Sequence, residues 1–128
     1  MGTARGNTRT TPLESIDERT YLLTEATDDK TYAYTKSNPV KVGGLSPSNE
    51  RRFLNALLGP NGEPIWYNRA GSCCPFKTPN GMMENTGLLD IYLVNWSGSK
   101  DTLTIYINMY DEGDLKIPVG LLAKKKGN

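Results

Sequence analysis

Two apolar stretches in the last third of the sequence constrain the fold more than any other feature. In each stretch every second residue is apolar. These residues are Leu89, Ile91 and Leu93 in the first stretch and Leu103, Ile105, Ile107 and Met109 in the second. A period of two is typical of half-buried β-strands. The polar segment 97–101 between them therefore predicts an antiparallel hairpin.

The register of this hairpin follows if both apolar sets share one face. A connection with an odd number of residues, such as 97–99, places Leu93 opposite Leu103 and Ile91 opposite Ile105. A two-residue connection would divide the apolar residues between the faces, so we predict the first register. The opposite face would then carry Tyr92, Val94, Trp96, Thr104, Tyr106, Asn108 and Tyr110.

One helix is predicted, over residues 47–58. Ser46 is a favourable N-cap, Pro47 suits the first helical position, and Gly59 suits the C-terminal end. Glu50 would lie near the positive end of the helix dipole. The apolar face would consist of Phe53, Leu54, Leu57 and Leu58.

The remaining strand signals are shorter. Segments 20–27 and 31–35 predict a hairpin around a turn at 28–30, and 40–42 predicts an edge strand because Pro39 cannot donate to a ladder. Residues 65–67 predict a short strand, and 71–87 predicts a loop rich in Gly and Pro.

Together these elements predict a single α+β domain. We expect a mainly antiparallel sheet of five or six strands with the helix packed on one face. Residues 1–18 are predicted to be a flexible leader, 19–122 the domain and 123–128 a basic tail. The chain has 128 residues, which suits one domain.

The charge distribution argues against a nucleic-acid partner. The net charge is +1, and the one basic run is Lys124 to Lys126 at the end. A nucleic-acid binder normally carries a basic stripe across its folded part, so we interpret this run as a solvated tail. No apolar run approaches the roughly 20 residues that span a bilayer, so no transmembrane segment is predicted.

The sequence contains no His and therefore lacks both the commonest general base and the commonest zinc ligand. It contains two Cys. We therefore predict no metal, no cofactor and no assigned catalytic residue. Cys73 and Cys74 are adjacent, and they suggest either a vicinal disulfide with thiol-dependent activity or one small buried residue beside a turn residue. The acidic run at 111–114 is interpreted as a polar turn, since it lacks the calcium-loop pattern.

The aromatic residues of the predicted hairpin are the candidate binding surface. Tyrosine and tryptophan on an exposed sheet face suit sugars, peptides or a protein partner. The simpler alternative is that this face is covered or merely half-exposed. Met82 and Met83, in the predicted loop, are a second candidate contact element. The candidate face consists of Tyr92, Trp96, Tyr106 and Tyr110.

Three stretches together resemble a small family of uncharacterised Gram-negative envelope proteins, many of them predicted lipoproteins. They are Ser48 to Gly62 (SNERRFLNALLGPNG), Gly71 to Phe76 (GSCCPF) and Tyr106 to Asp111 (YINMYD). The resemblance covers about residues 20–120. It implies an envelope location, in the periplasm or tethered to the outer membrane, with a lipid anchor on a Cys of the full-length precursor.

Three functional hypotheses follow. The first is a non-enzymatic envelope binding or interaction module with an unknown protein or glycan partner. The second is a thiol-dependent activity at Cys73 and Cys74. The third is 2-dehydro-3-deoxyphosphooctonate aldolase, a label that some resembling proteins carry. It is the least favoured, because that class uses a (β/α)8 barrel of about 200 residues or more.

Overall fold

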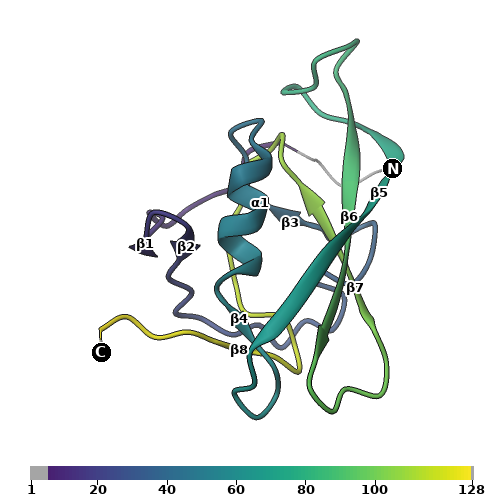
Figure 1. The fold of residues 1–128 in the computed structure, drawn as a ribbon. Helices are drawn as coiled ribbons and strands as arrows, with labels where there is room; N and C mark the ends of the chain where they lie inside the picture. Colours follow the sequence, from purple (N-terminus) through teal and green to yellow (C-terminus); the bar gives the residue numbers. More distant parts are fainter. Residues whose placement is uncertain (1–5, 128) are drawn as a thin grey trace.

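The centre of the fold is a four-stranded sheet. The computed structural model describes residues 6–127. The sheet order is β3 (Val40–Lys41), β7 (Leu103–Asn108), β6 (Thr86–Trp96) and β5 (Ile65–Lys77). β7, β6 and β5 pair antiparallel, whereas β3 runs parallel to β7 at the edge (Figure 1).

The predicted β6–β7 hairpin is present, but the predicted register is wrong by one residue. Val94 pairs with Leu103 and Tyr92 pairs with Ile105, so these side chains share the core face. Ile91 and Leu93 point to the other face, where they are half-buried. Both faces of β6 carry bulky apolar residues, and the alternation therefore could not identify the face that the helix covers.

The predicted loop 71–87 is strand at its two ends and a loop only over 78–85. β5 continues to Lys77 and pairs with β6 along almost its whole length. Register shifts fall between Arg69 and Gly71 and between Cys73 and Phe76. These bulges accommodate the glycine, cysteine and proline residues whose presence suggested a loop.

The helix α1 (Pro47–Leu54) packs on the core face of the sheet, but it is shorter than predicted (Figure 1). Ser46 is extended and makes no side-chain cap, and Pro47 occupies the first turn. The chain leaves the helix after Asn55. Leu57–Leu58 then form β4, which pairs antiparallel with β8 (Leu122–Ala123) and takes over two positions of the expected helical face.

The N-terminal half of the domain is mostly irregular. β1 (Ser15–Asp17) and β2 (Thr20–Tyr21) form a small antiparallel pair beside α1. The predicted strand 31–35 is wrong, because these residues form turns. Tyr32 and Ala33 are nevertheless buried in the core. The edge strand at Val40 is confirmed.

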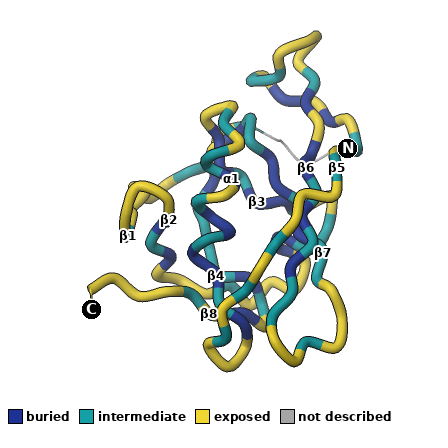
Figure 2. The backbone as a smooth tube through the Cα atoms, viewed as in Figure 1, coloured by how far each residue is buried: buried dark blue, intermediate teal, exposed yellow. Residues whose placement is uncertain are grey.

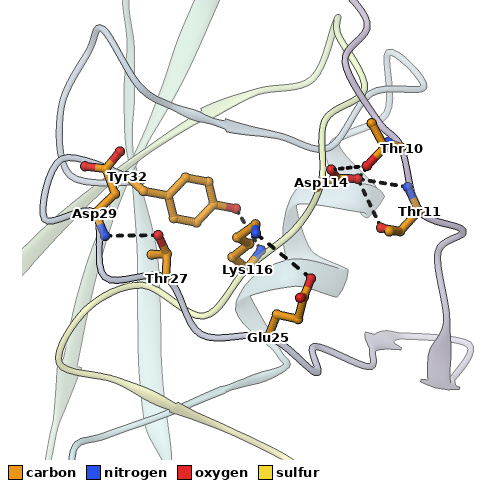
Figure 3. A network of polar contacts seen from close by, with 8 residues as sticks. All are labelled: Thr10, Thr11, Glu25, Thr27, Asp29, Tyr32, Asp114 and Lys116. Atoms are coloured by element: carbon orange, nitrogen blue, oxygen red, sulfur yellow. Dashed lines mark hydrogen bonds and ion pairs between the residues drawn. The ribbon is translucent and has the colours of Figure 1, made fainter.

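The described part of the predicted flexible leader, residues 6–18, is held on the domain instead. The Arg9 guanidinium donates to the carbonyl of Gly113 at 2.8 Å. Asp114 accepts hydrogen bonds from the backbone N–H and hydroxyl groups of Thr10 and Thr11 (Figure 3). These donors, chiefly those of Thr10, hold the pKa of Asp114 well below its usual range. Residues 1–5 of the leader lie outside the described residues.

The core is one cluster between α1, the sheet and the segment around Tyr32, and the buried stretches of the tube in Figure 2 converge there. The fold class is therefore the predicted single α+β domain. In the described part of the chain the strands divide into three sheets rather than one of five or six. It does not have the (β/α)8 architecture implied by the aldolase label. Within residues 6–127 no helix is long and apolar enough to cross a bilayer.

Candidate functional site

The four aromatic residues predicted to form one binding face do not lie together. Tyr92 is in the core with 3% of its surface exposed, and Trp96 is half-buried against the same core. Tyr106 points to the opposite face of the sheet, because it pairs with Ile91. Tyr110 packs edge-on against Phe76, with 5.9 Å between the ring centroids. The single aromatic surface is thus not formed.

The β5–β6 hairpin extends beyond the rest of the fold, and its turn stands clear of α1 and the sheet (Figure 1). Two methionines at the turn are the most exposed large apolar side chains of the described residues, with 74% exposure at Met82 and 78% at Met83. Leu88 on β6 is 42% exposed. The structure therefore presents apolar side chains to solvent at the end of a projecting element.

The first part of the hairpin turn is anchored by a buried carboxyl group. Asp111 has no exposed surface. It accepts hydrogen bonds from the hydroxyl of Thr78, from Asn80 Nδ2 at 2.9 Å and from Asn108 Nδ2 at 2.8 Å. The expected polar turn at 111–114 thus includes a buried anchor. The hairpin turn is held at Thr78 and Asn80, whereas Met82 and Met83 beyond them are exposed.

The two adjacent cysteines form a disulfide on the outer part of β5. Cys73 pairs with Leu89, whereas Cys74 lies in a bulge with a left-handed φ of 68°. Both residues are half-buried. No cysteine of the described residues is a free thiol, so any thiol chemistry must begin with reduction of this bond.

A buried acidic pair lies between α1 and β6. Oε1 of Glu50 accepts a hydrogen bond from the Tyr92 hydroxyl at 3.0 Å, and Oε2 accepts none from the described residues. Burial, followed by the adjacent Asp90 carboxyl, raises the pKa of Glu50 to about 9. In its protonated form Glu50 can donate to the neighbouring Asp90 carboxyl. Glu50 lies in the first turn of α1, as predicted, but its raised pKa favours the neutral carboxyl at that position.

Asp90 is held from the other side by Arg69, whose Nη2 lies 2.8 Å from Oδ1. This hydrogen bond and the charge of Asp90 raise the pKa of the Arg69 guanidinium. Arg69, Asp90, Glu50 and Tyr92 thus form one polar chain from the surface into the core. Glu50 has no exposed surface and therefore cannot contact a substrate in this conformation.

A pocket of about 450 Å³ lies between the β1–β2 turn, α1 and β5. Three arginines contribute to its wall, and they come from two separate segments of the chain. The lining residues are Glu18, Arg19, Ser48, Arg51, Arg52, Asn55 and Tyr67. In the described part of the chain, no carboxylate oxygen lies within 4.0 Å of a guanidinium nitrogen of these three arginines.

Among residues 6–127 no group of three or more His, Cys, Asp and Glu is arranged to hold a metal ion. Comparisons of the chain with protein-family models, with curated proteins and with solved structures gave no match.

Sequence reasoning missed the buried acids and the arginine pocket. Glu50 lies three and four positions before Phe53 and Leu54, which places it on the apolar side of α1. Asp90 interrupts an apolar strand. Both positions were signals of buried carboxyl groups. The sequence contains no comparable signal that places Arg19 near Arg51 and Arg52, because only the tertiary structure brings them together.

Proposed function

We propose that the protein is a non-enzymatic binding module whose contact element is the hairpin turn 78–86. The observation that carries this proposal is the exposure of Met82 and Met83 at the end of an anchored, projecting hairpin. Methionine side chains are flexible and polarizable, and they suit an apolar groove on a protein partner. The cell-envelope location and the lipid-anchored precursor implied by the resemblance belong to this proposal.

Anchoring of the turn at Thr78 and Asn80 supports the same function. The hydrogen bonds to Asp111 hold this part of the turn in place before any partner binds. Preorganisation lowers the entropy lost on binding, so a small apolar turn can contribute useful affinity.

Variant competition tests the proposal. The unmodified protein is immobilised, and bound proteins from the source organism are identified after competition with soluble variants. We expect M82S/M83S to lose competition for a specific partner, whereas L122S retains it, because Leu122 is exposed on β8 and distant in sequence from the hairpin. Equal competition by both variants, or no specific partner, would contradict the proposal.

A second candidate is thiol–disulfide exchange, which the half-exposed Cys73–Cys74 disulfide favours. An external dithiol would supply two electrons and two protons, open the S–S bond to two thiols and itself become a disulfide. Native protein should then consume one equivalent of dithiothreitol, and C73S/C74S should consume none. A disulfide that reacts only after unfolding would exclude this activity.

A further inference from the structure

We propose that the pocket lined by Arg19, Arg51 and Arg52, here called the arginine pocket, binds a compact oxyanion carrying about two negative charges. The ligand class is a phosphate or a pair of carboxylates. This site is separate from the hairpin turn and does not depend on the function proposed there.

The charge of the arginine pocket is the first argument. Three arginines and Glu18 line it, which gives 3 − 1 = +2. The three guanidinium groups have no carboxylate ion pair among the described residues. The pKa of Asp17, next to Glu18 in the sequence, is lowered chiefly by a hydrogen bond from the Arg19 backbone N–H and to a smaller extent by the charge of Lys124. Lys124 therefore adds positive charge near the pocket. Net positive charge attracts an anion.

Two of the guanidinium groups are already oriented. Arg52 donates through Nε to the Glu18 carbonyl at 2.8 Å and through Nη1 to Asn49 Oδ1 at 2.9 Å. Arg51 donates through Nη2 to the Ser48 hydroxyl at 3.2 Å. Each keeps further N–H donors for a ligand, since a guanidinium carries five. Planar guanidinium forks match carboxylate and phosphate oxygens.

Unlike Arg51 and Arg52, the Arg19 side chain has no structural role among the described residues that would account for its position in the pocket. Arg51 and Arg52 lie in the last turn of α1, where positive charge also favours the helix dipole. Arg19 lies on the β1–β2 turn, and none of the hydrogen bonds described for this part of the chain comes from its guanidinium. Its side chain is therefore available to a ligand.

The neutral wall of the pocket is also ordered. The Tyr67 hydroxyl donates to Asn55 Oδ1 at 2.7 Å, and Asn55 Nδ2 donates to the Arg19 carbonyl at 2.8 Å. This pair links β5, α1 and the β1–β2 turn. A volume of about 450 Å³ leaves room for a small organic molecule behind the anionic group.

The test is titration of the full chain with inorganic phosphate and, separately, with succinate, followed by NMR at low ionic strength. We expect saturable shifts centred on Arg19, Asn55 and Tyr67 with at least one probe, weakened by added NaCl. The probe that binds more tightly identifies the oxyanion class.

Charge variants make this test specific. R19Q should weaken binding about tenfold or more, and E18Q should strengthen it because it removes the one acid of the wall. K100Q, an exposed lysine of the β6–β7 connection outside the pocket, should bind as the unmodified protein does. Shifts that do not saturate, or equal binding by R19Q and K100Q, would overturn the arginine pocket as a site.

Discussion

The Tyr92 hydroxyl lies 3.0 Å from Oε1 of Glu50, and both residues are buried between α1 and β6. This contact joins the helix to the sheet through a polar group at the centre of an apolar core. A buried carboxyl without a positive partner is stable there only in its neutral form. The Asp90 carboxyl beside it strengthens the preference for the proton.

The first prediction concerns the protonation of Glu50. The glutamine of E50Q reproduces a protonated acid, because it can accept from Tyr92 and donate to Asp90. We expect E50Q to change the free energy of unfolding at pH 4, below the pKa of the free side chain, by less than about 1 kcal/mol, whereas E50A should lose about 2–4 kcal/mol there by leaving a cavity and an unpaired hydroxyl. Urea unfolding followed by fluorescence measures both. A large loss in E50Q would show that Glu50 is ionised.

The second prediction is the pH dependence that follows. The folded pKa of Glu50, about 9, is above the value of 4.5 for the free side chain, so the folded state holds the proton more tightly. Stability from this group is full below pH 4.5 and is lost as the pH rises towards 9, at up to about 1.4 kcal/mol per unit. Asp90, Tyr92 and Arg69 act on the Glu50 carboxyl, and the charge of Arg51 acts on Tyr92.

E50Q is the control for this pH profile, because it cannot lose that proton. The difference in unfolding free energy between E50Q and the unmodified protein should grow between pH 6 and pH 9. Parallel stability profiles would show that Glu50 does not hold its proton in the folded state.

The third prediction concerns Arg69. R69Q removes the 2.8 Å contact to Asp90 and should lower the free energy of unfolding by about 1 kcal/mol, a modest effect because the Arg69 side chain is 52% exposed. The double variant E50Q/R69Q should deviate from additivity, since both residues hold Asp90. Strict additivity in chemical denaturation would show that the two contacts are independent.

The fourth prediction tests the anchor of the hairpin. D111A removes the acceptor of the buried donors Thr78 and Asn108 and one acceptor of the half-exposed Asn80, and should cost about 2–4 kcal/mol. Hydrogen exchange should accelerate first at the backbone amides of Thr78 and Gly81. The exposed neighbour variant E112Q should change neither quantity by much. An unchanged exchange rate at Thr78 in D111A would contradict the anchoring role.

The fifth prediction concerns the disulfide. A bond between adjacent residues closes almost no chain loop, so it restricts the unfolded state very little. We expect C73S/C74S to change the free energy of unfolding by less than about 1 kcal/mol and to keep the β5–β6 register. Thermal unfolding with and without reductant gives the same comparison. A loss of several kcal/mol would show that the disulfide supports the hairpin.

Residues with strong local backbone preferences correctly predicted where the helix starts and where the edge strand lies. Pro47 marked the start of α1, and Pro39 marked the edge strand that follows at Val40. The β6 register failed because Tyr92 and Ile91 are both suitable core residues, and the position of α1 decides between them. The strand continuing through Cys74 was missed because bulges depend on the partner strand.

The site was less predictable than the fold. The sequence predicts Met82 and Met83 as a contact element, and both are exposed, but it does not predict their projection on a long hairpin. The arginine pocket required the β1–β2 turn to fold against α1, which no periodicity indicates. Glu50 could have been identified as buried from its place beside Phe53, but its partner Asp90 is 40 residues away in the sequence.

Site-specific photocrosslinking at Met83 tests the central claim most directly. A photoreactive residue is placed at position 83 and, as a matched control, at the exposed Lys100 of the other connection. With components of the source organism, position 83 should give a discrete protein adduct that excess unmodified protein suppresses and M82S/M83S does not. The same adduct from both positions, or suppression by both competitors, would contradict the hairpin as the binding element.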